Sequence, residues 1–276
     1  MNGAPAVPHD PARDLSPTGF RFRLLDLLVG LAARTPLQAA SAFAWAVAWT
    51  WWLLAPIRKA VAVRNFRACL PGVPVRPALL RMMHNLVLSY FEFLQFDRVQ
   101  VRVEGADGLT GAVVVAGHGG AWDATILGTA EVIPMTIFFR TPKNQWVQAL
   151  LARLRDAHGV QRLETGATMA DGYAALEAGR NVFFVQDQRH NKGASIPLFG
   201  RPARTSLGAA VASIKTGRPL YGCWQHREGV GRHVIRFERL ELTGTAEART
   251  LALNAWYEAQ VRERPHGWLW LHDRWK

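Results

Sequence analysis

Short apolar runs alternate with helix-like segments from Val99 to the end of the chain, and this alternation restricts the possible folds most strongly. The apolar runs are VQVRVEG, AVVVAG, MTIFF, NVFFVQD, LYGCWQH and HVIRFERLEL, and helical patterns occur near 122–131, 144–157, 167–178, 206–216 and 246–264. This order predicts the α/β class, with a mixed central sheet flanked by helices. AVVVAG and NVFFVQD are apolar on both faces, which predicts buried central strands.

An uncharged segment runs from Thr35 to Ile57. Thr35 and Pro36 are typical of a helix start, and Pro56 is typical of a stop. A helix of about 20 apolar residues can cross a bilayer, so the length is sufficient. Four of the eleven tryptophans lie between positions 45 and 52, and Trp favours the membrane–water interface. The segment predicts an apolar, membrane-associating helix or hairpin.

Basic residues flank this segment on both sides, at Arg21, Arg23 and Arg34 before it and at Arg58, Lys59, Arg64 and Arg67 after it. A simple spanning helix carries its basic excess on the cytoplasmic side only, so symmetric flanks leave three arrangements open. The first is a span with the rest of the chain on the cytoplasmic face. The second is a helical hairpin, about 21–34 and 36–55, in one leaflet. The third is a buried helix of a soluble protein.

The chain divides into three predicted parts. Residues 1–19 carry four prolines and no apolar run, so we expect a flexible tail and no signal peptide. Residues 20–70 form the predicted membrane-anchoring segment, which ends in a polar helix at about 57–69. Residues 71–276 contain a longer helix at about 76–96 and the predicted sheet, and we expect the active site there.

The formal net charge of +12 at pH 7 indicates an anionic partner. The candidates are anionic membrane lipid, an acidic carrier protein and nucleic acid, but no nucleic-acid-binding motif is present, so nucleic acid is not expected. Cys69 and Cys223 belong to no CxxC or His-rich cluster, so no metal site is expected. Without a GxGxxG or Walker loop, no bound cofactor is expected either.

The segment VVVAGHGGAWDA, residues 113–124, places a histidine directly after a buried strand. The carboxyl ends of strands carry the sites of most α/β sheets, which makes His118 a candidate. On one continuous helix, His118 and Asp123 would point about 140° apart. A turn at Gly119 and Gly120 would instead let Asp123, on the first helical turn, fold back onto the imidazole.

A His–Asp contact of this kind predicts general-base chemistry, because it fixes the tautomer and makes the other ring nitrogen more basic. The competing interpretation is a structural histidine bonded to a helix-capping aspartate, and the pattern leaves both open. The sequence contains no GxSxG elbow, so it offers no obvious serine nucleophile. We therefore expect His118 to activate a hydroxyl group of the substrate.

Further polar side chains follow other predicted strands. Arg140 comes after MTIFF, and its planar guanidinium suits a phosphate, although the pattern fits an ordinary surface arginine equally well. Asp187 ends NVFFVQD and would serve as a helper carboxylate, a substrate anchor or a turn former. IPLFGRPART, residues 196–205, leads into a predicted helix with Thr205 or Ser206 as N-cap, and that helix start suits an anion.

These segments resemble the lysophospholipid acyltransferase superfamily, and most closely its bacterial lipid A biosynthesis (late) acyltransferase family. The matching pieces are HGGAWD at 118–123, FRTPKN at 139–144, DQRHNKGASIPLFGRPART at 187–205, KTGRPLYGC at 215–223 and HGWLWLHDRWK at 266–276. The resemblance extends over about residues 20–276 and implies a glycerolipid-acyltransferase-like fold. HGGAWD replaces the family's commoner Gly-Asn pair and RHNKGAS its usual extension, and these departures concern the acceptor more than the reaction.

The resemblance also implies roles for the residues. His118 is the general base and Asp123 orients it, while the substrate-binding residues are Arg140, Asn144, Asp187, Gln188 and Arg204. The implied activity is that of an O-acyltransferase, which moves a fatty acyl chain from acyl carrier protein or coenzyme A to a membrane glycolipid hydroxyl. The implied acceptor is a lipid A precursor, and the implied location is the cytoplasmic side of the bacterial inner membrane.

Other functions stay open at this point. The acceptor could instead be a mannosylated phosphoinositide, a lysophospholipid or an amino-acid lipid. The same residues would also serve a hydrolase that cleaves acyl thioesters with water. A third hypothesis is a basic membrane-binding protein with a decayed site.

Overall fold

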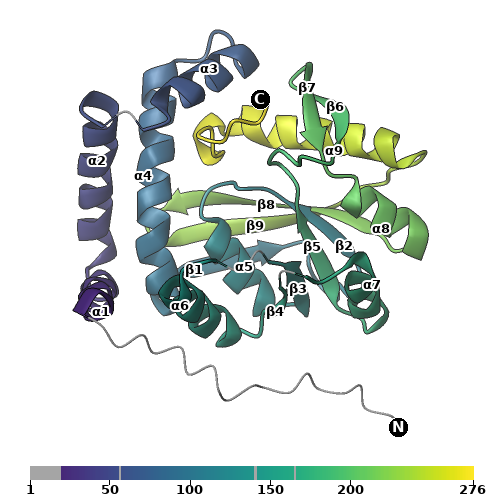
Figure 1. Ribbon diagram of the computed structural model, residues 1–276, viewed down its shortest axis with the longest axis horizontal. Helices are drawn as coiled ribbons and strands as arrows, with labels where there is room; N and C mark the ends of the chain where they lie inside the picture. Colours follow the sequence, from purple (N-terminus) through teal and green to yellow (C-terminus); the bar gives the residue numbers. More distant parts are fainter. Residues whose placement is uncertain (1–19, 56, 140–141, 165) are drawn as a thin grey trace.

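The computed structural model describes residues 20–55, 57–139, 142–164 and 166–276. The predicted tail at 1–19 and the predicted helix stop at Pro56 lie outside the described residues. In the described part, a central sheet has helices on both faces, and α2 (Leu37–Leu53) and α4 (Val75–Leu94) stand along one side of it (Figure 1).

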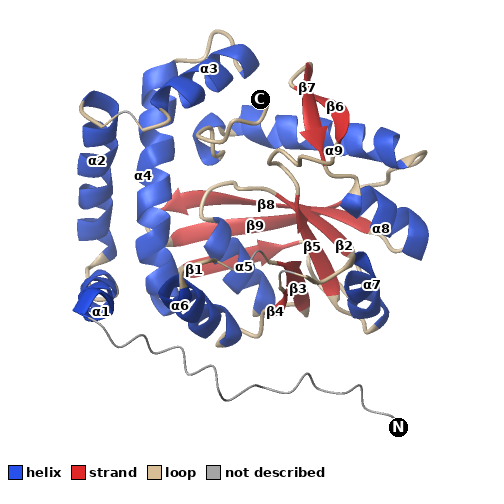
Figure 2. Cartoon of the chain, in the orientation of Figure 1, coloured by secondary structure: helices blue, strands red, loops and turns tan. Residues whose placement is uncertain are grey.

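The central sheet contains seven strands in the order β1-β9-β8-β2-β5-β3-β4 (Figure 2). The strands are β1 Gln100–Glu104, β2 Val113–Ala116, β3 Met135–Phe138, β4 Gln161–Leu163, β5 Asn181–Val185, β8 Leu220–Gly229 and β9 Arg232–Arg239. The neighbouring pairs in this order are parallel except β8 and β9, which are antiparallel. The predicted α/β class with a mixed central sheet is confirmed, although β4 was not predicted.

Helices cover both faces of the sheet, as its apolar strands require. They are α5 Trp122–Ala130, α6 Gln145–Asp156, α7 Met169–Glu177, α8 Gly208–Thr216 and α9 Ala246–Glu263. Val113 and Val115 pack with α7, α8 and α9, whereas Val114 and Ala116 pack with α5 and α6, because side chains alternate along a strand. All four residues of β2 are buried, as the AVVVAG run predicts.

Four helices precede the sheet: α1 Phe20–Ala32, α2 Leu37–Leu53, α3 Lys59–Cys69 and α4 Val75–Leu94. The predicted apolar segment forms α2, and its Ala40 and Ala44 pack in one cluster with Leu88 of α4. None of the helices in the described part is both long and apolar enough to cross a bilayer. Membrane association of α1 and α2 stays a prediction.

One hydrophobic core extends from the N-terminal helices into the sheet. Trp51 of α2 and Phe66 of α3 belong to the same buried cluster as Val113 of β2 and Leu253 of α9. The division of the chain at residue 70 into an anchoring segment and an acyltransferase domain stays a prediction.

A hairpin that the sequence does not predict lies between β5 and α8. It consists of β6 Ala194–Leu198 and β7 Arg201–Thr205. Phe199 and Gly200 join the two strands with positive φ angles of 52° and 68°. Two consecutive positive φ angles match the twist of a hairpin, but Phe-Gly is not the Asn-Gly signal that usually marks such a turn.

The start of α8 corrects the predicted capping residues in part. Ser206 accepts a hydrogen bond at Oγ from the backbone N–H of Gly208 at 3.1 Å. Thr205 is still in β7 and donates its hydroxyl to the carbonyl of Ala203 at 3.0 Å. The hairpin therefore removes Thr205 from the helix start, and Leu207 occupies the N-cap position.

Candidate active site

His118 and Asp187 meet at the carboxyl edge of two neighbouring parallel strands. β2 ends at Ala116 and β5 ends at Val185, and these two residues are paired in the register of the sheet. His118 follows Ala116 by two residues, and Asp187 follows Val185 by two residues. Because parallel strands end at the same edge, this register brings together two residues that are distant in the sequence.

Asp187 holds His118 through two hydrogen bonds. Asp187 Oδ1 lies 2.8 Å from His118 Nδ1, and Asp187 Oδ2 accepts from the backbone N–H of His118 at 2.8 Å. A carboxylate only accepts hydrogen bonds, so Nδ1 carries the ring proton and Nε2 keeps a lone pair. The Asp187 side chain is 2% exposed and that of His118 is 25% exposed. The imidazole is therefore fixed on its buried side and accessible on the other.

The C-terminal segment, residues 266–276, completes the surroundings of Asp187. Trp268 donates its Nε1–H to Asp187 Oδ2 at 2.8 Å. The backbone N–H of Gly120 donates to the carbonyl of Gly267 at 2.5 Å, which attaches the same segment to the bend after His118. Asp187 thus accepts three hydrogen bonds, and such bonds favour the ionised form of a carboxyl group.

The surroundings shift the pKa values of both groups. Burial alone would lower the pKa of His118, but the charge of Asp187, its hydrogen bond and the charge of Asp123 outweigh burial and raise that pKa. Burial would raise the pKa of Asp187, but His118 and the hydrogen bonds from His118 and Trp268 hold it below its ordinary value. The site therefore combines an ionised carboxylate with an imidazole of increased basicity.

A glycine bend follows His118, as the sequence predicts. Gly120 has a φ of +57°, and a Cβ there would lie 1.9 Å from Gln225 Oε1. A Cβ on Gly119 would lie 2.7 Å from the ring of Trp224. Neither position has space for a side chain, so the close packing under the bend requires both glycines.

The hydrogen bond predicted between Asp123 and His118 is made by Asp187 instead. Asp123 Oδ1 accepts from Arg155 Nη2 of α6 at 2.8 Å, and both side chains are nearly buried. A buried carboxylate needs a compensating cation, and Arg155 supplies it. Asp123 still lies close enough for its charge to raise the pKa of His118. A catalytic role for Asp123 stays a prediction, without the direct contact.

His118 lines a narrow cavity between α4 and the C-terminal segment. The other lining residues are Met82, Asn85, Leu86, Gly120, Trp122, His266, Gly267, Trp268 and Leu269. The ring of Trp122 meets the imidazole edge-on, with centroids 5.5 Å apart. Its lining is mostly aliphatic and aromatic, and its volume of about 10 Å³ is that of about one water molecule.

Two predicted substrate-binding residues lie between β3 and α6 in the sequence. Arg140 lies outside the described residues. Asn144 is exposed, and its Oδ1 accepts from the backbone N–H groups of Trp146 and Val147 at 3.0 and 3.2 Å. Asn144 therefore caps the start of α6. Contact of either residue with substrate stays a prediction.

The other two substrate-binding candidates beside Asp187 differ in position. Gln188 lines a second narrow cavity that also contains Asp187 and Trp268. Arg204 lies on β7, where its exposed side chain donates to the carbonyl of Asn191 at 3.2 Å. Arg204 lines neither of these two cavities. The structure places Gln188 near the site and Arg204 outside its cavities, and substrate contact of both stays a prediction.

Sequence analysis missed Trp268, Arg155 and Gln225 as residues of the site. Trp268 belongs to the block at 266–276 that carries the family resemblance, so its motif was visible but its role was not. Gln225 Oε1 accepts from the backbone N–H of Ala121 at 2.9 Å, at the end of the glycine bend. No local pattern marks Arg155 or Gln225, because each reaches the site only through tertiary packing.

The two cysteines line neither of the two cavities at His118 and Asp187. Cys69 and Cys223 are buried free thiols, and burial raises the pKa of Cys69 to about 11. Among the residues that the structure describes, no group of three His, Cys, Asp or Glu side chains could hold a metal ion.

A mostly parallel sheet with a buried carboxylate behind an accessible histidine at its carboxyl edge is typical of α/β enzymes. The model of a family described as bacterial lipid A biosynthesis acyltransferase matches residues 27–276. The chain belongs to this acyltransferase family, and the resemblance predicted from the sequence blocks is confirmed. No curated protein matches the chain.

Proposed function

We propose that this protein transfers a fatty acyl group from a thioester of acyl carrier protein or coenzyme A to a hydroxyl of a lipid A precursor. The proposal rests on one observation. Asp187 is hydrogen-bonded to Nδ1 of His118, so Nε2 is free to act as a base on a partly exposed ring. Membership of the lipid A acyltransferase family supports both the acyl transfer and the acceptor class.

The proposed reaction needs one base and no protein nucleophile. His118 Nε2 takes the proton of the lipid hydroxyl while the hydroxyl oxygen attacks the thioester carbonyl carbon. The tetrahedral intermediate then collapses, the C–S bond breaks, and the imidazolium returns the proton to the leaving thiolate. The products are a lipid ester and a free thiol. Asp187 stabilises the imidazolium between the two proton transfers without taking a proton.

Asp123 has an indirect role in this proposal. Its pairing with Arg155 connects the first turn of α5 to α6, next to Trp122 and the cavity. Its charge adds to that of Asp187 in favouring the imidazolium form of His118. We therefore assign the orienting contact to Asp187 and an electrostatic and structural contribution to Asp123.

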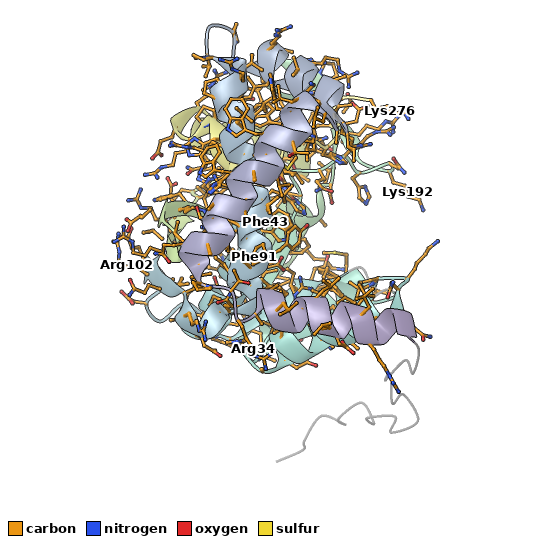
Figure 3. All side chains as sticks on the ribbon, turned by 90° about the vertical axis from the view of Figure 1, so that its left-hand side faces the viewer. Arg34, Phe43, Phe91, Arg102, Lys192 and Lys276 are labelled. Atoms are coloured by element: carbon orange, nitrogen blue, oxygen red, sulfur yellow. The ribbon has the colours of Figure 1, made fainter. Side chains whose placement is uncertain are left out.

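An apolar face on the N-terminal helices supports docking on a membrane. Nine large apolar side chains are exposed on α1, on α2 and between α2 and α3: Leu24, Leu27, Leu28, Leu31, Phe43, Trp49, Leu53, Leu54 and Ile57. Figure 3 views the molecule from this side, with α1 and α2 foremost and Phe43 labelled on α2. Exposed large apolar side chains concentrated in one part of a protein are typical of interaction sites, and an acceptor lipid would reach the enzyme from such a surface.

Basic side chains next to this face support an anionic partner. A shallow groove on α3 is lined by Lys59, Ala60, Val63, Arg64, Arg67 and Ala68. It follows Leu54 and Ile57 in the chain, and its Arg64 is already paired with Asp273 at 2.5 Å. Anionic headgroups of the cytoplasmic leaflet would neutralise Lys59 and Arg67, and an acidic carrier protein would be attracted by the same charges.

The test is the identity of the product. The purified full chain is incubated with acyl carrier protein or coenzyme A carrying a labelled acyl group, together with a bacterial lipid extract that contains lipid A precursors. Mass spectrometry should find a lipid A precursor heavier by one acyl group in place of one hydrogen. Labelled free fatty acid alone would identify a thioester hydrolase, and a different labelled lipid would replace the acceptor.

A further inference from the structure

A chain of buried polar side chains lies behind the glycine bend, and the proposed reaction does not use it. Gln225 of β8 and His233 of β9 are each 2% exposed, and Glu92 of α4 is fully buried. Each buried polar group costs free energy unless it is hydrogen-bonded, so such a chain is stable only in a fixed arrangement.

The chain connects α4 to the backbone of the bend. Gln225 Oε1 accepts from the N–H of Ala121 at 2.9 Å. Gln225 Nε2 contacts His233 Nδ1, and His233 Nε2 lies 3.2 Å from Glu92 Oε2. Gln225 and His233 are close because β8 and β9 are neighbours and both side chains lie on the face of the sheet toward α4.

Glu92 anchors the far end of the chain. Its Oε1 accepts from the backbone N–H of Gly231 at 2.9 Å and also from Arg227 Nη1. Arg227 compensates the buried charge, and the contacts of Glu92 hold the pKa of its carboxyl below its ordinary value although burial alone would raise it. Glu92 therefore provides a fixed anionic end.

Only one orientation of the groups is consistent with these contacts. Because Gln225 Oε1 faces an N–H donor, the Gln225 amide must present Nε2, which only donates, to His233. His233 Nδ1 must then be the acceptor, so the ring proton lies on Nε2, on the side of Glu92. A flip of the Gln225 amide would place donor against donor at Ala121. The contacts at Ala121 and His233 therefore fix each other, whereas His233 Nε2 and Glu92 Oε2 approach to 3.2 Å without forming a hydrogen bond.

The same amide lies directly under the bend that follows His118. A Cβ on Gly120 would lie 1.9 Å from Gln225 Oε1, and the N–H of Gly120 is held from the other side by Gly267. Asp187 fixes the imidazole itself, whereas Gln225 fixes the chain that leads from His118 to the cavity-lining Trp122.

We propose that Gln225, held by His233 and Glu92, is a positioning residue that sets the course of the bend from Gly119 to Ala121. This inference rests on the proposed function, because its consequence is a correct distance between His118 and the lipid hydroxyl. An error of about 1 Å in such a distance can cost about 100-fold in rate.

The test compares three substitutions at this position with a matched control. Gln225→Met removes both hydrogen-bonding ends, and Gln225→Asn keeps the amide but shortens its reach. Gln225→Glu keeps the acceptor for Ala121 and presents a second oxygen to His233, which can bind a proton at Nδ1. The control is Asn181→Leu, since the Asn181 amide is also fully buried and accepts from the backbone N–H of Ala112 at 3.0 Å, at the opposite edge of the sheet.

Two measurements distinguish a positioning role of Gln225 from a general loss of stability in its variants. Amide hydrogen exchange of the peptide 117–124 should become about tenfold faster or more in Q225M and Q225N, and should be unchanged in N181L and Q225E. In the acyl transfer assay, kcat of Q225M and Q225N should fall about 10- to 100-fold with KM for the acyl donor within about twofold. Q225E should keep kcat within about threefold of the unsubstituted chain.

The outcomes also separate this inference from the proposed function. If the amides of the peptide 117–124 exchange in Q225M and Q225N at the rate of the unsubstituted chain, Gln225 has no positioning role, whatever the activity of these variants. A fall in activity that matches N181L and follows only the folded fraction would overturn it as well. If the unsubstituted chain transfers no acyl group, the proposed function fails, while the exchange data still decide whether Gln225 holds the bend. If Q225M does not fold, Q225N and Q225E decide the question.

Discussion

The Nδ1 atom of His118 and the Oδ1 atom of Asp187 lie 2.8 Å apart, although the two residues are separated by 69 positions in the sequence. The parallel register of β2 and β5 produces this contact, and the C-terminal Trp268 binds the same carboxylate. The two acidic residues near His118 therefore have different partners. Asp187 fixes the tautomer of the imidazole, and Asp123 pairs with Arg155.

Asp187→Asn should reduce kcat by about 10³-fold, because an amide no longer stabilises the imidazolium and can present a donor to Nδ1, which favours the wrong tautomer. The side chain keeps its size, so the fold should be retained. The measurement is kcat for acyl transfer together with the circular dichroism spectrum. A folded D187N protein within threefold of normal kcat would contradict the orienting role.

Asp123→Asn should mainly affect stability. It leaves the Arg155 guanidinium nearly buried without its carboxylate, and breaking a buried pair from one side costs about 3–5 kcal/mol. The double variant D123N/R155M should recover a large part of this loss, which urea denaturation of both single variants and the double variant would measure as a coupling free energy.

The activity of D123N separates the roles of the two acids. At a temperature where D123N is folded, its kcat should fall less than that of D187N, because the bond between Asp187 and Nδ1 persists. A folded D123N protein as inactive as a variant without His118 would restore Asp123 as the orienting acid.

The pH dependence of kcat/KM should show an ascending limb above pH 6.5. His118 must be neutral to accept a proton, and Asp187 raises its pKa above the ordinary value of 6.5. D187N should move this limb to lower pH, because the carboxylate that favours the imidazolium is absent. A limb that stays in place in D187N would show that another group titrates.

The raised pKa of His118 also makes the free energy of unfolding depend on pH, in a defined direction. Because folding raises the pKa of His118, the charged pair contributes its full stability below about pH 6.5. That contribution is lost as the pH rises through the raised pKa of the folded protein. The difference in unfolding free energy between the unsubstituted chain and D187N should therefore shrink from pH 6 to pH 9, and a constant difference would argue against the pairing.

The sequence predicts the parts of this fold that have local causes. β2 and β5 are recognisable because their runs are apolar on both faces, and the bend after His118 is recognisable from Gly119 and Gly120. The partner of His118 depends on the register between two strands, which no local pattern encodes. Asp187 could therefore be predicted only as a residue at the carboxyl edge of the sheet, with the roles of helper carboxylate, substrate anchor and turn former left open.

Other features have no local signal at all. The hairpin of β6 and β7 turns at Phe199 and Gly200, and a phenylalanine with positive φ is rarely found in such a turn. Arg155 and Gln225 reach the site from α6 and β8 through tertiary packing alone. In each case the missing information is a contact between distant segments.

Charged substitutions on the apolar face should weaken membrane binding without unfolding the protein. Leu27 and Leu31 of α1 are 58% and 55% exposed, so Leu27→Asp with Leu31→Asp removes little packing. Co-sedimentation with vesicles of phosphatidylethanolamine and phosphatidylglycerol should fall about tenfold or more, since a charge in the interface is costly.

The matched control for this experiment is Ile214→Asp. Ile214 is also exposed, at 44%, but it lies on α8, on the other side of the sheet from α1 and α2 (Figure 1). I214D should bind vesicles normally. Equal loss of binding in I214D and in the double variant would mean that the face on α1 and α2 has no special role.

The most direct test of the central claim is the rate of acyl transfer by His118→Ala, measured with the labelled thioester and the lipid A precursor. We expect a loss of at least about 100-fold with the fold and vesicle binding retained, because the variant has no base at the carboxyl edge of β2 and β5. A folded H118A protein that transfers the acyl group at the normal rate would contradict the assignment of His118 as the base.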